Sequence, residues 1–285
     1  MERDLFLMMA EIIDTITCLP VQRAIIASFL CGISCSFLSV FVVLMKMPLI
    51  GVSMSHAAFA GAVLGIIWGL NPFLSGLLMC IIVAGTLGPL SDRTDLAPEN
   101  MLGIIFSFLM GIAFLGMGII SKTRATALNL LWGNLLTLSK IDIIILSWTT
   151  LCVFLFVVLF FKEIKLIIFN RRLAYLSGIP EKTIYYTLLF LTGMVVSSNL
   201  STVGGLLIFA LLVQPGAVAL QLTYNLKLFF LIAAISGVVS CLLGLILSYV
   251  FDIPSGASIV LVSTSIFALA YMFSPKRKYK NKELN

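Results

Sequence analysis

The sequence predicts an all-α polytopic membrane protein with about nine transmembrane helices. Of its 285 residues, 61% are hydrophobic and 11% charged, and the mean hydropathy is +1.16. A soluble domain carries about 25% charged residues. Inside lipid every backbone polar group must be bonded within the chain, so only helices or a closed barrel can span a bilayer. The apolar runs are continuous and lack the alternation of barrel strands, so helices are predicted.

Charge-free runs locate the predicted spans, since one span needs about 20 residues. Two runs are about twice that long. Asn71-Pro72 divides the first, and a stretch rich in Ser, Asn and Gly at 197–205 divides the second. Nine helices follow from the runs at 24–45, 47–91, 100–121, 143–161, 183–226, 228–251 and 253–275. Residues 125–139 are apolar but too short for a span, and are expected to form an interfacial or re-entrant segment on the outer face.

Basic residues set the orientation of these spans. An odd count places the two ends on opposite faces, and a cytoplasmic C-terminus puts 13 of the 18 Lys and Arg residues inside. The predicted organisation is an extracytoplasmic N-terminal segment at 1–23, a membrane domain at 24–275 and a basic cytoplasmic tail at 276–285. This placement explains the net charge of +6 without nucleic acid. The six cysteines include no CxxC pair and are interpreted as small apolar fillers.

The predicted spans contain no Asp, Glu, Lys or Arg. Ion-driven transporters and proton pumps usually place such a residue within a span, and an intramembrane aspartyl protease needs its acids there. If the protein moves a solute uphill, the energy is therefore expected to come from another subunit.

His56 is the only histidine of the chain, and it is expected to lie inside the bilayer, where the predicted spans carry no charged residue. It lies eight residues beyond Pro48, or about 12 Å at 1.5 Å per residue, which is near the middle of a hydrocarbon core of about 30 Å. One interpretation is a ligand or gate for a permeating cation. The other is a histidine bonded to a serine, such as Ser53 or Ser55, or to a backbone carbonyl across a helix pair. A single histidine is a weak signal, because metal sites usually need three or four ligands.

Small residues and one proline shape the predicted helices. Two stripes with four-residue spacing predict close helix packing, Ser28–Gly32–Ser36 and Ala57–Gly61–Gly65–Gly69. Further along, Gln214-Pro215-Gly216 predicts a kinked or broken helix. Such a break either lines a cavity or is an ordinary proline of a membrane helix.

The predicted cytoplasmic loop at 163–180 contains a short helix. The residues Arg171 to Leu176 are expected to form one or two turns that end before Gly178 and Pro180. This segment either holds the topology through its basic charge or docks a cytoplasmic partner.

Four stretches, in this order, resemble the permease subunits of ABC importers for zinc, manganese and related divalent metals. They are residues 46–51 running on into Ser55-His56-Ala57, residues 169–180, VGGLLIFALLVQPGAVA at 203–219, and 252–257. The second stretch is similar to the family's ATPase-coupling helix, with Ala174 and Gly178 in place. The resemblance covers about residues 20–273, and the ordered set is more specific than any one motif.

The resemblance implies a homodimeric permease, with 24–275 as the permease domain, in the cytoplasmic membrane of a bacterium or archaeon. Its implied partners are two cytoplasmic ABC ATPase subunits and an extracytoplasmic metal-binding protein. The cargo would be a divalent metal, zinc or manganese first, and ATP would bind the partner. This chain has no GxxxxGK[ST] loop, so no enzyme activity or cofactor of its own is expected. The implied site residues are His56 as a pathway metal ligand, Arg171, Arg172, Leu173, Ala174, Leu176 and Gly178 in ATPase coupling, and Gln214, Pro215 and Gly216 at the broken helix.

The chain departs from the family pattern at two places. An aspartate commonly stands four residues before the histidine, and here that position is Val52. Asn170 and Arg172 stand where acidic residues are usual in the coupling segment, which suggests a complementary acidic groove on the ATPase. Soft donors nearby in sequence are Met54, Cys31 and Cys35, although such residues usually fill cores.

Three other functions stay open at this point. A secondary transporter or channel is disfavoured by the charge-free interior. A membrane enzyme, such as a lipid-modifying one, would have only His56 as an acid–base group within the bilayer. A permease of the same fold for a non-metal solute remains possible because of Val52.

Overall fold

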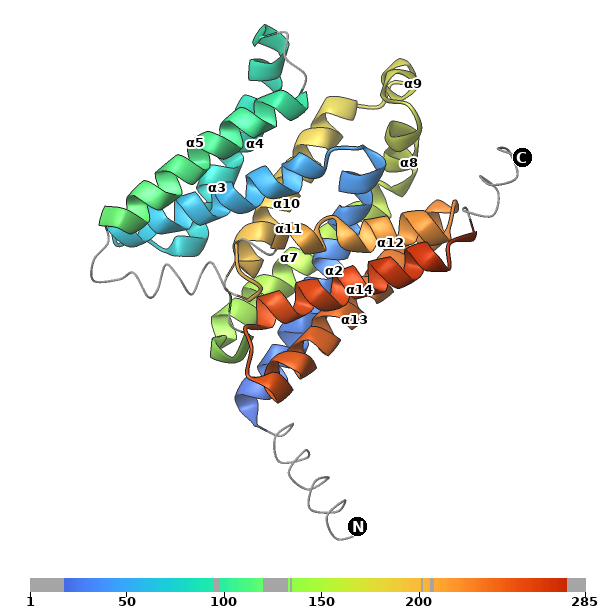
Figure 1. Ribbon diagram of the computed structural model, residues 1–285. Helices are drawn as coiled ribbons and strands as arrows, with labels where there is room; N and C mark the ends of the chain where they lie inside the picture. Colours follow the sequence, from blue (N-terminus) through green and yellow to red (C-terminus); the bar gives the residue numbers. More distant parts are fainter. Residues whose placement is uncertain are drawn as a thin grey trace.

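The computed structural model describes residues 18–94, 98–119, 133, 135–200, 202–205 and 208–275, which form helices and connecting turns without any strand. Figure 1 shows the arrangement. The longer helices are α2 (Leu19–Leu44), α3 (Pro48–Ile67), α4 (Pro72–Thr94), α5 (Pro98–Ile119), α7 (Lys140–Leu159), α10 (Glu181–Asn199), α13 (Leu226–Phe251) and α14 (Ser255–Met272). The shorter ones are η1 (Leu135–Thr137), α8 (Phe161–Phe169), α9 (Arg171–Leu176), α11 (Ile208–Leu211) and α12 (Gln214–Leu222).

Six of the described helices are long and apolar enough to cross a bilayer, namely α2, α5, α7, α13, α14 and the Leu49–Ile67 part of α3. The other three predicted spans correspond to α4, α10 and the α11–α12 pair. The apolar parts of α4 and of α11–α12 are shorter, at Pro72–Thr86 and Ile208–Leu222, and α10 opens with Glu181-Lys182. The all-helical membrane fold is confirmed for the described residues, while the count of nine and the orientation stay predictions.

Both predicted divisions of the long apolar runs are confirmed. Between α3 and α4, the Asn71 side chain accepts a hydrogen bond from the Phe73 amide at 2.9 Å. α10 ends at Asn199, and the next described helix begins at Ile208. α2 begins at Leu19, so residues 19–23 of the predicted N-terminal segment are helical. The tail at 276–285 and most of the predicted outer segment at 125–139 lie outside the described residues.

Close packing joins α3 to its neighbours α4 and α5, which lie together at one side of Figure 1. A Cβ atom on Gly61 would lie 2.9 Å from the Cα of Gly76 in α4. On the other face of α3, Val63 lies against Gly116 of α5, where a Cβ would come within 2.6 Å of its Cγ1. The packing interpretation of the small-residue stripe in this helix is therefore confirmed.

The second close crossing joins α2 to α13. A Cβ on Gly32 would lie 2.7 Å from the Cα of Val238, and one on Gly237 would lie 2.8 Å from the Gly32 carbonyl oxygen. Neither helix could approach this far with a larger residue at the crossing. α2 thus packs on α13 as the stripe at Ser28–Gly32–Ser36 predicts.

Large apolar side chains cover the outer faces of several helices. Phe108 of α5 is 67% exposed and Trp148 of α7 is 63% exposed. A soluble protein rarely exposes apolar patches of this extent. These faces suit lipid or another membrane helix, in agreement with the predicted environment.

Candidate translocation pathway and coupling site

His56 lies on α3 where this helix packs against α5. Its side chain is 5% exposed. Nδ1 lies 2.8 Å from the carbonyl oxygen of Val52, one helical turn earlier. The imidazole stands nearly perpendicular to the ring of Phe106, with centroids 4.7 Å apart. Because a carbonyl can only accept, Nδ1 carries the proton, and a neutral ring then keeps its lone pair on Nε2.

The partner of His56 differs from the serine or cross-helix carbonyl that the sequence suggests. The hydrogen bond stays within α3, since side chains of a helix point back toward its N-terminus and reach the preceding turn. Ser53 instead donates to the Leu102 carbonyl of α5 at 3.2 Å. The Ser55 hydroxyl is buried and has no hydrogen-bond partner among the described residues. The backbone-carbonyl interpretation is correct in kind, but its placement across a helix pair is wrong.

His56 has no cluster of further ligands within the part of the chain that the structure describes, which contains no group of three or more His, Cys, Asp or Glu able to hold a metal. Val52, where the family commonly has aspartate, is a half-buried apolar residue. The thiols of Cys31 and Cys35 lie 4.0 Å apart, with Cys241 of α13 beside Cys31. They belong to the α2–α13 interface rather than to the α3–α5 interface of His56. One chain therefore offers a metal a single imidazole nitrogen here.

The predicted break at Gln214-Pro215-Gly216 is present. α11 ends at Leu211 and α12 begins at Gln214. Pro215 has no amide hydrogen, and the Gly216 amide turns to another helix. It donates to the hydroxyl of Ser39 on α2 at 2.6 Å, while that hydroxyl donates to the Val213 carbonyl at 3.2 Å. One serine side chain thus satisfies a donor and an acceptor at the break.

Two side chains extend this connection to α14. The Gln214 side chain donates through Nε2 to the Thr264 hydroxyl at 2.8 Å. Its Oε1 is buried without a hydrogen-bond partner among the described residues. The broken helix is therefore bonded to α2 on one side and to α14 on the other, and it holds one unused carbonyl oxygen.

The short helix α9 spans the residues predicted for it, Arg171–Leu176. Asn170 caps its start, since Oδ1 accepts from the amides of Arg172 and Leu173 at 2.9 and 3.2 Å. At its end, Gly178 has φ +78°, and the amides of Gly178 and Ile179 bond back to the carbonyls of Tyr175 and Ala174. This is a Schellman arrangement, which favours glycine at the left-handed position. The caps fix where the six-residue helix begins and ends.

Arg171 holds α9 against the start of α10. Its Nε and Nη2 donate to the same oxygen of Glu181 at 3.0 and 2.9 Å, and its guanidinium lies 4.6 Å from the centre of the Tyr185 ring. Within α9, Ala174 is fully buried against the rest of the chain. The opposite side presents apolar side chains to the outside, with Leu173, Tyr175 and Leu176 at 45%, 68% and 73% exposed. An exposed apolar surface on a capped, anchored helix suits contact with another protein.

These features agree with a comparison against known families. Residues 19–274 match the model of the ABC 3 transport family. The chain belongs to the ABC 3 transport family. The resemblance noted in the sequence is therefore confirmed, and so is the membrane character of the fold.

Curated relatives match this member of the ABC 3 transport family along about nine tenths of their length. The manganese transport system membrane protein MntC of Halalkalibacterium halodurans is 36% identical over 259 residues, which is 90% of this chain and 88% of the relative. The manganese import system permease protein ScaB of Streptococcus gordonii is 31% identical, over 92% and 94% of the two chains. The chelated iron transport system membrane protein YfeD of Yersinia pestis is 28% identical over 92% and 88%.

Two solved structures share the fold. One, described as PsaBC from Streptococcus pneumoniae in complex with Fab, superposes with a TM-score of 0.87 at 27% identity, covering 96% of this chain and 99% of that one. An inward-facing putative metal-chelate type ABC transporter superposes with a TM-score of 0.72 at 15% identity, over 88% and 85%. The second likeness concerns the fold alone.

Two residues of the site, Ser39 and Glu181, are not among those predicted from the sequence of this ABC 3 family member. Ser39 is one of several small polar residues of α2, and nothing local marks it as the partner of a break 177 residues away. Glu181 has a local signal, because it opens a helix ten residues after Arg171 across a tight turn. An opposite charge at that spacing across a Gly-x-Pro turn could have suggested the pair.

Proposed function

We propose that this chain is the membrane permease of an ABC importer for divalent metal ions, with manganese as the first candidate. The observation that carries the proposal is the family match over residues 19–274, together with relatives named for manganese transport that align over about nine tenths of their length. The cytoplasmic ATPase, the extracytoplasmic binding protein and the homodimer are parts of the same proposal.

α9 is the proposed contact for the ATPase. Its exposed Leu173, Tyr175 and Leu176 would enter a groove of the partner, while the Arg171–Glu181 pair ties any displacement of α9 to α10. α10 packs directly on α3 and α4. A movement driven by ATP on the partner would therefore be passed to the helix that carries His56.

His56 is the proposed pathway ligand. One chain supplies one nitrogen, so a second copy would supply a second imidazole, with water and backbone carbonyls completing a transient shell. Such a weak site suits a cargo that must leave again. The segment Gln214-Pro215-Gly216 would form a second polar site along the pathway. There, Gln214 Oε1 is a hydrogen-bond acceptor without a partner among the described residues.

Metal uptake by the assembled transporter tests the proposal. The chain would be expressed with its ATPase and binding protein in cells that lack their own manganese importers, and radioactive manganese uptake measured. Uptake that needs all three proteins and an intact ATPase is expected, with zinc, iron and cobalt as competitors. Uptake that continues without the ATPase would instead indicate a secondary transporter or channel.

A non-metal cargo is the second candidate, and it rests on Val52. An apolar side chain stands where the family commonly has a carboxylate, which removes a hard ligand. If all tested metals fail to enter, while the ATPase still assembles, the cargo is not a divalent metal.

A further inference from the structure

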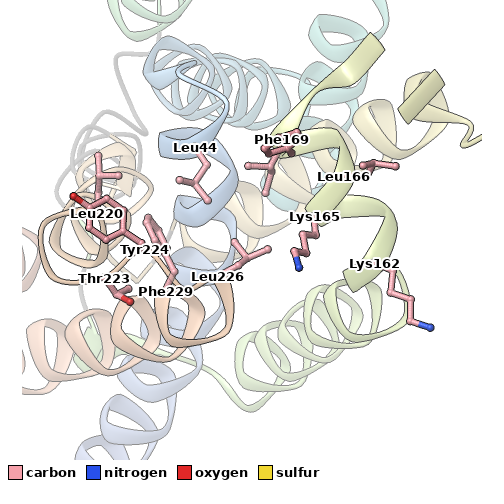
Figure 2. Close-up of a pocket in the computed structure, with 11 residues that line it drawn as sticks. Leu44, Lys162, Lys165, Leu166, Phe169, Leu220, Thr223, Tyr224, Leu226 and Phe229 are labelled. Carbon is pink, nitrogen blue, oxygen red and sulfur yellow. The ribbon is translucent and has the colours of Figure 1, made fainter. Parts of the chain in front are cut away.

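A hollow of about 570 Å³ opens beside the end of α2, between α8 and the junction of α12 with α13. Figure 2 shows Lys162 and Lys165 on one side and Leu220, Thr223 and Tyr224 on the other, with Leu44 and Leu226 between them. Leu166, Ile168, Phe169 and Phe229 complete the lining. The hollow is thus mostly apolar. In Figure 2 the ammonium group of Lys165 points toward it, whereas Lys162 stands at its edge with the ammonium group turned outward.

The lengths of two helices lead us to expect the hollow at the depth of lipid headgroups. α2 and α13 have 26 residues each, which corresponds to about 39 Å at 1.5 Å per residue and exceeds a hydrocarbon core of about 30 Å. Leu44 is the last residue of α2, and Leu226 the first of α13. We therefore expect the place where these two ends meet to lie at the membrane–water interface, with the apolar faces of both helices continuing into the hydrocarbon core.

The charged residues that line the hollow itself have one sign. Lys162 and Lys165 line it without any Asp or Glu among the lining residues. Lys227 joins Lys165 at an adjoining hollow. Glu163, the nearest carboxylate on α8, lines a neighbouring hollow together with Lys162 and Lys227. An occupant of this hollow would therefore meet positive charge at its polar end and apolar side chains along its length.

We propose that this hollow binds one anionic phospholipid. Its phosphate would lie against Lys165 and draw the long side chain of Lys162 in from the edge of the hollow, and an acyl chain would run past Leu220 and Phe229. Basic pockets between membrane helices are known to bind acidic headgroups in this way. Only Asn170 separates α8 from α9, so a lipid seated here would also stabilise the position of the coupling helix. The site does not depend on the cargo, and its test is independent of transport.

Native mass spectrometry of the full chain in an uncharged detergent tests the site, with phosphatidylglycerol titrated against phosphatidylcholine. Wild-type protein is expected to retain one phosphatidylglycerol in preference to phosphatidylcholine. The double variant Lys162→Gln/Lys165→Gln should bind it about 25-fold more weakly, at roughly fivefold per lysine near an acidic headgroup. The matched control Lys140→Gln/Lys182→Gln removes two exposed lysines elsewhere and should bind as wild type.

Three outcomes would overturn the proposal. They are equal binding of the two lipids, an equal loss in both double variants, and equal binding of glycerophosphoglycerol, which has the headgroup without acyl chains. The last result would assign the hollow to a free anion. Failure of metal uptake would leave the lipid result unchanged.

Discussion

The hydroxyl of Ser39 lies 2.6 Å from the amide nitrogen of Gly216 and accepts its hydrogen bond. The two residues belong to α2 and to the start of α12, and a Cβ on Gly216 would lie 2.6 Å from the Ser39 carbonyl oxygen. The same hydroxyl donates to Val213. A helix broken by Pro215 is therefore closed by a side chain of another helix, which avoids unpaired backbone groups within the membrane.

Ser39→Ala should destabilise the protein. It leaves the Gly216 amide without a partner, and a buried unsatisfied donor costs about 1–3 kcal/mol. We expect a lower midpoint of thermal unfolding in detergent and reduced transport by the assembled complex. Ser34→Ala is the matched control, since Ser34 is equally buried but donates to the Cys31 carbonyl within α2. An equal shift for both variants would show that the bridge to α12 contributes nothing specific.

The positions of the helices could be predicted largely from the sequence because their signals are local. The Asn71-Pro72 division and the turns at Arg171–Leu176 depend on residues within a few positions of each other. Charge-free runs likewise located the apolar segments. The start of α2 at Leu19 was missed because Arg23 interrupts the run, yet Arg23 donates to the Leu138 carbonyl at 3.3 Å from within the helix.

The contacts of the site could not be predicted in the same way. The environment of His56 depends on which face of α3 meets α5, and so on Phe106, 50 positions away. The bond between Ser39 and Gly216 likewise depends on the register of two helices far apart in the chain. Hydrophobic periodicity says little about such faces, because a buried membrane helix is apolar all round.

Charge reversal at Arg172 should weaken binding of the ATPase. Arg172 is exposed on α9 and makes no ion pair within the described residues, whereas Arg171 is paired with Glu181. If the partner groove is acidic, Arg172→Glu places like charges together, at a cost of several kcal/mol. We expect at least tenfold weaker co-purification with the ATPase. Lys140→Glu makes the same charge change on the predicted outer face and should leave assembly intact. Normal assembly of Arg172→Glu would count against an acidic groove.

His56→Ala should abolish metal uptake while leaving assembly intact. The substitution removes Nε2, the ring nitrogen that does not bond to Val52, whereas the Val52 carbonyl keeps its place in the backbone of α3. Phe106→Leu is the control for packing, since it changes the ring against His56 without touching the imidazole nitrogens. We expect Phe106→Leu to retain most of the uptake measured with radioactive manganese. Uptake by His56→Ala at the wild-type rate would exclude the histidine from the pathway.

Val52→Asp should change which metals the transporter accepts. It places a carboxylate one turn before His56, where residues i and i+4 are neighbours, and a hard oxygen ligand beside an imidazole favours manganese over softer ions. A carboxylate at this depth costs about 2.5–3.5 kcal/mol unless it is paired or binds a cation, so metal is expected to protect the variant against thermal unfolding. Val52→Asn has nearly the same shape without the charge and should keep the wild-type profile. The measurement is competition of zinc, iron and cobalt against manganese uptake. A profile that is identical in all three proteins would show that position 52 does not contact the cargo, and the absence of the family's aspartate would then carry no information about the metal.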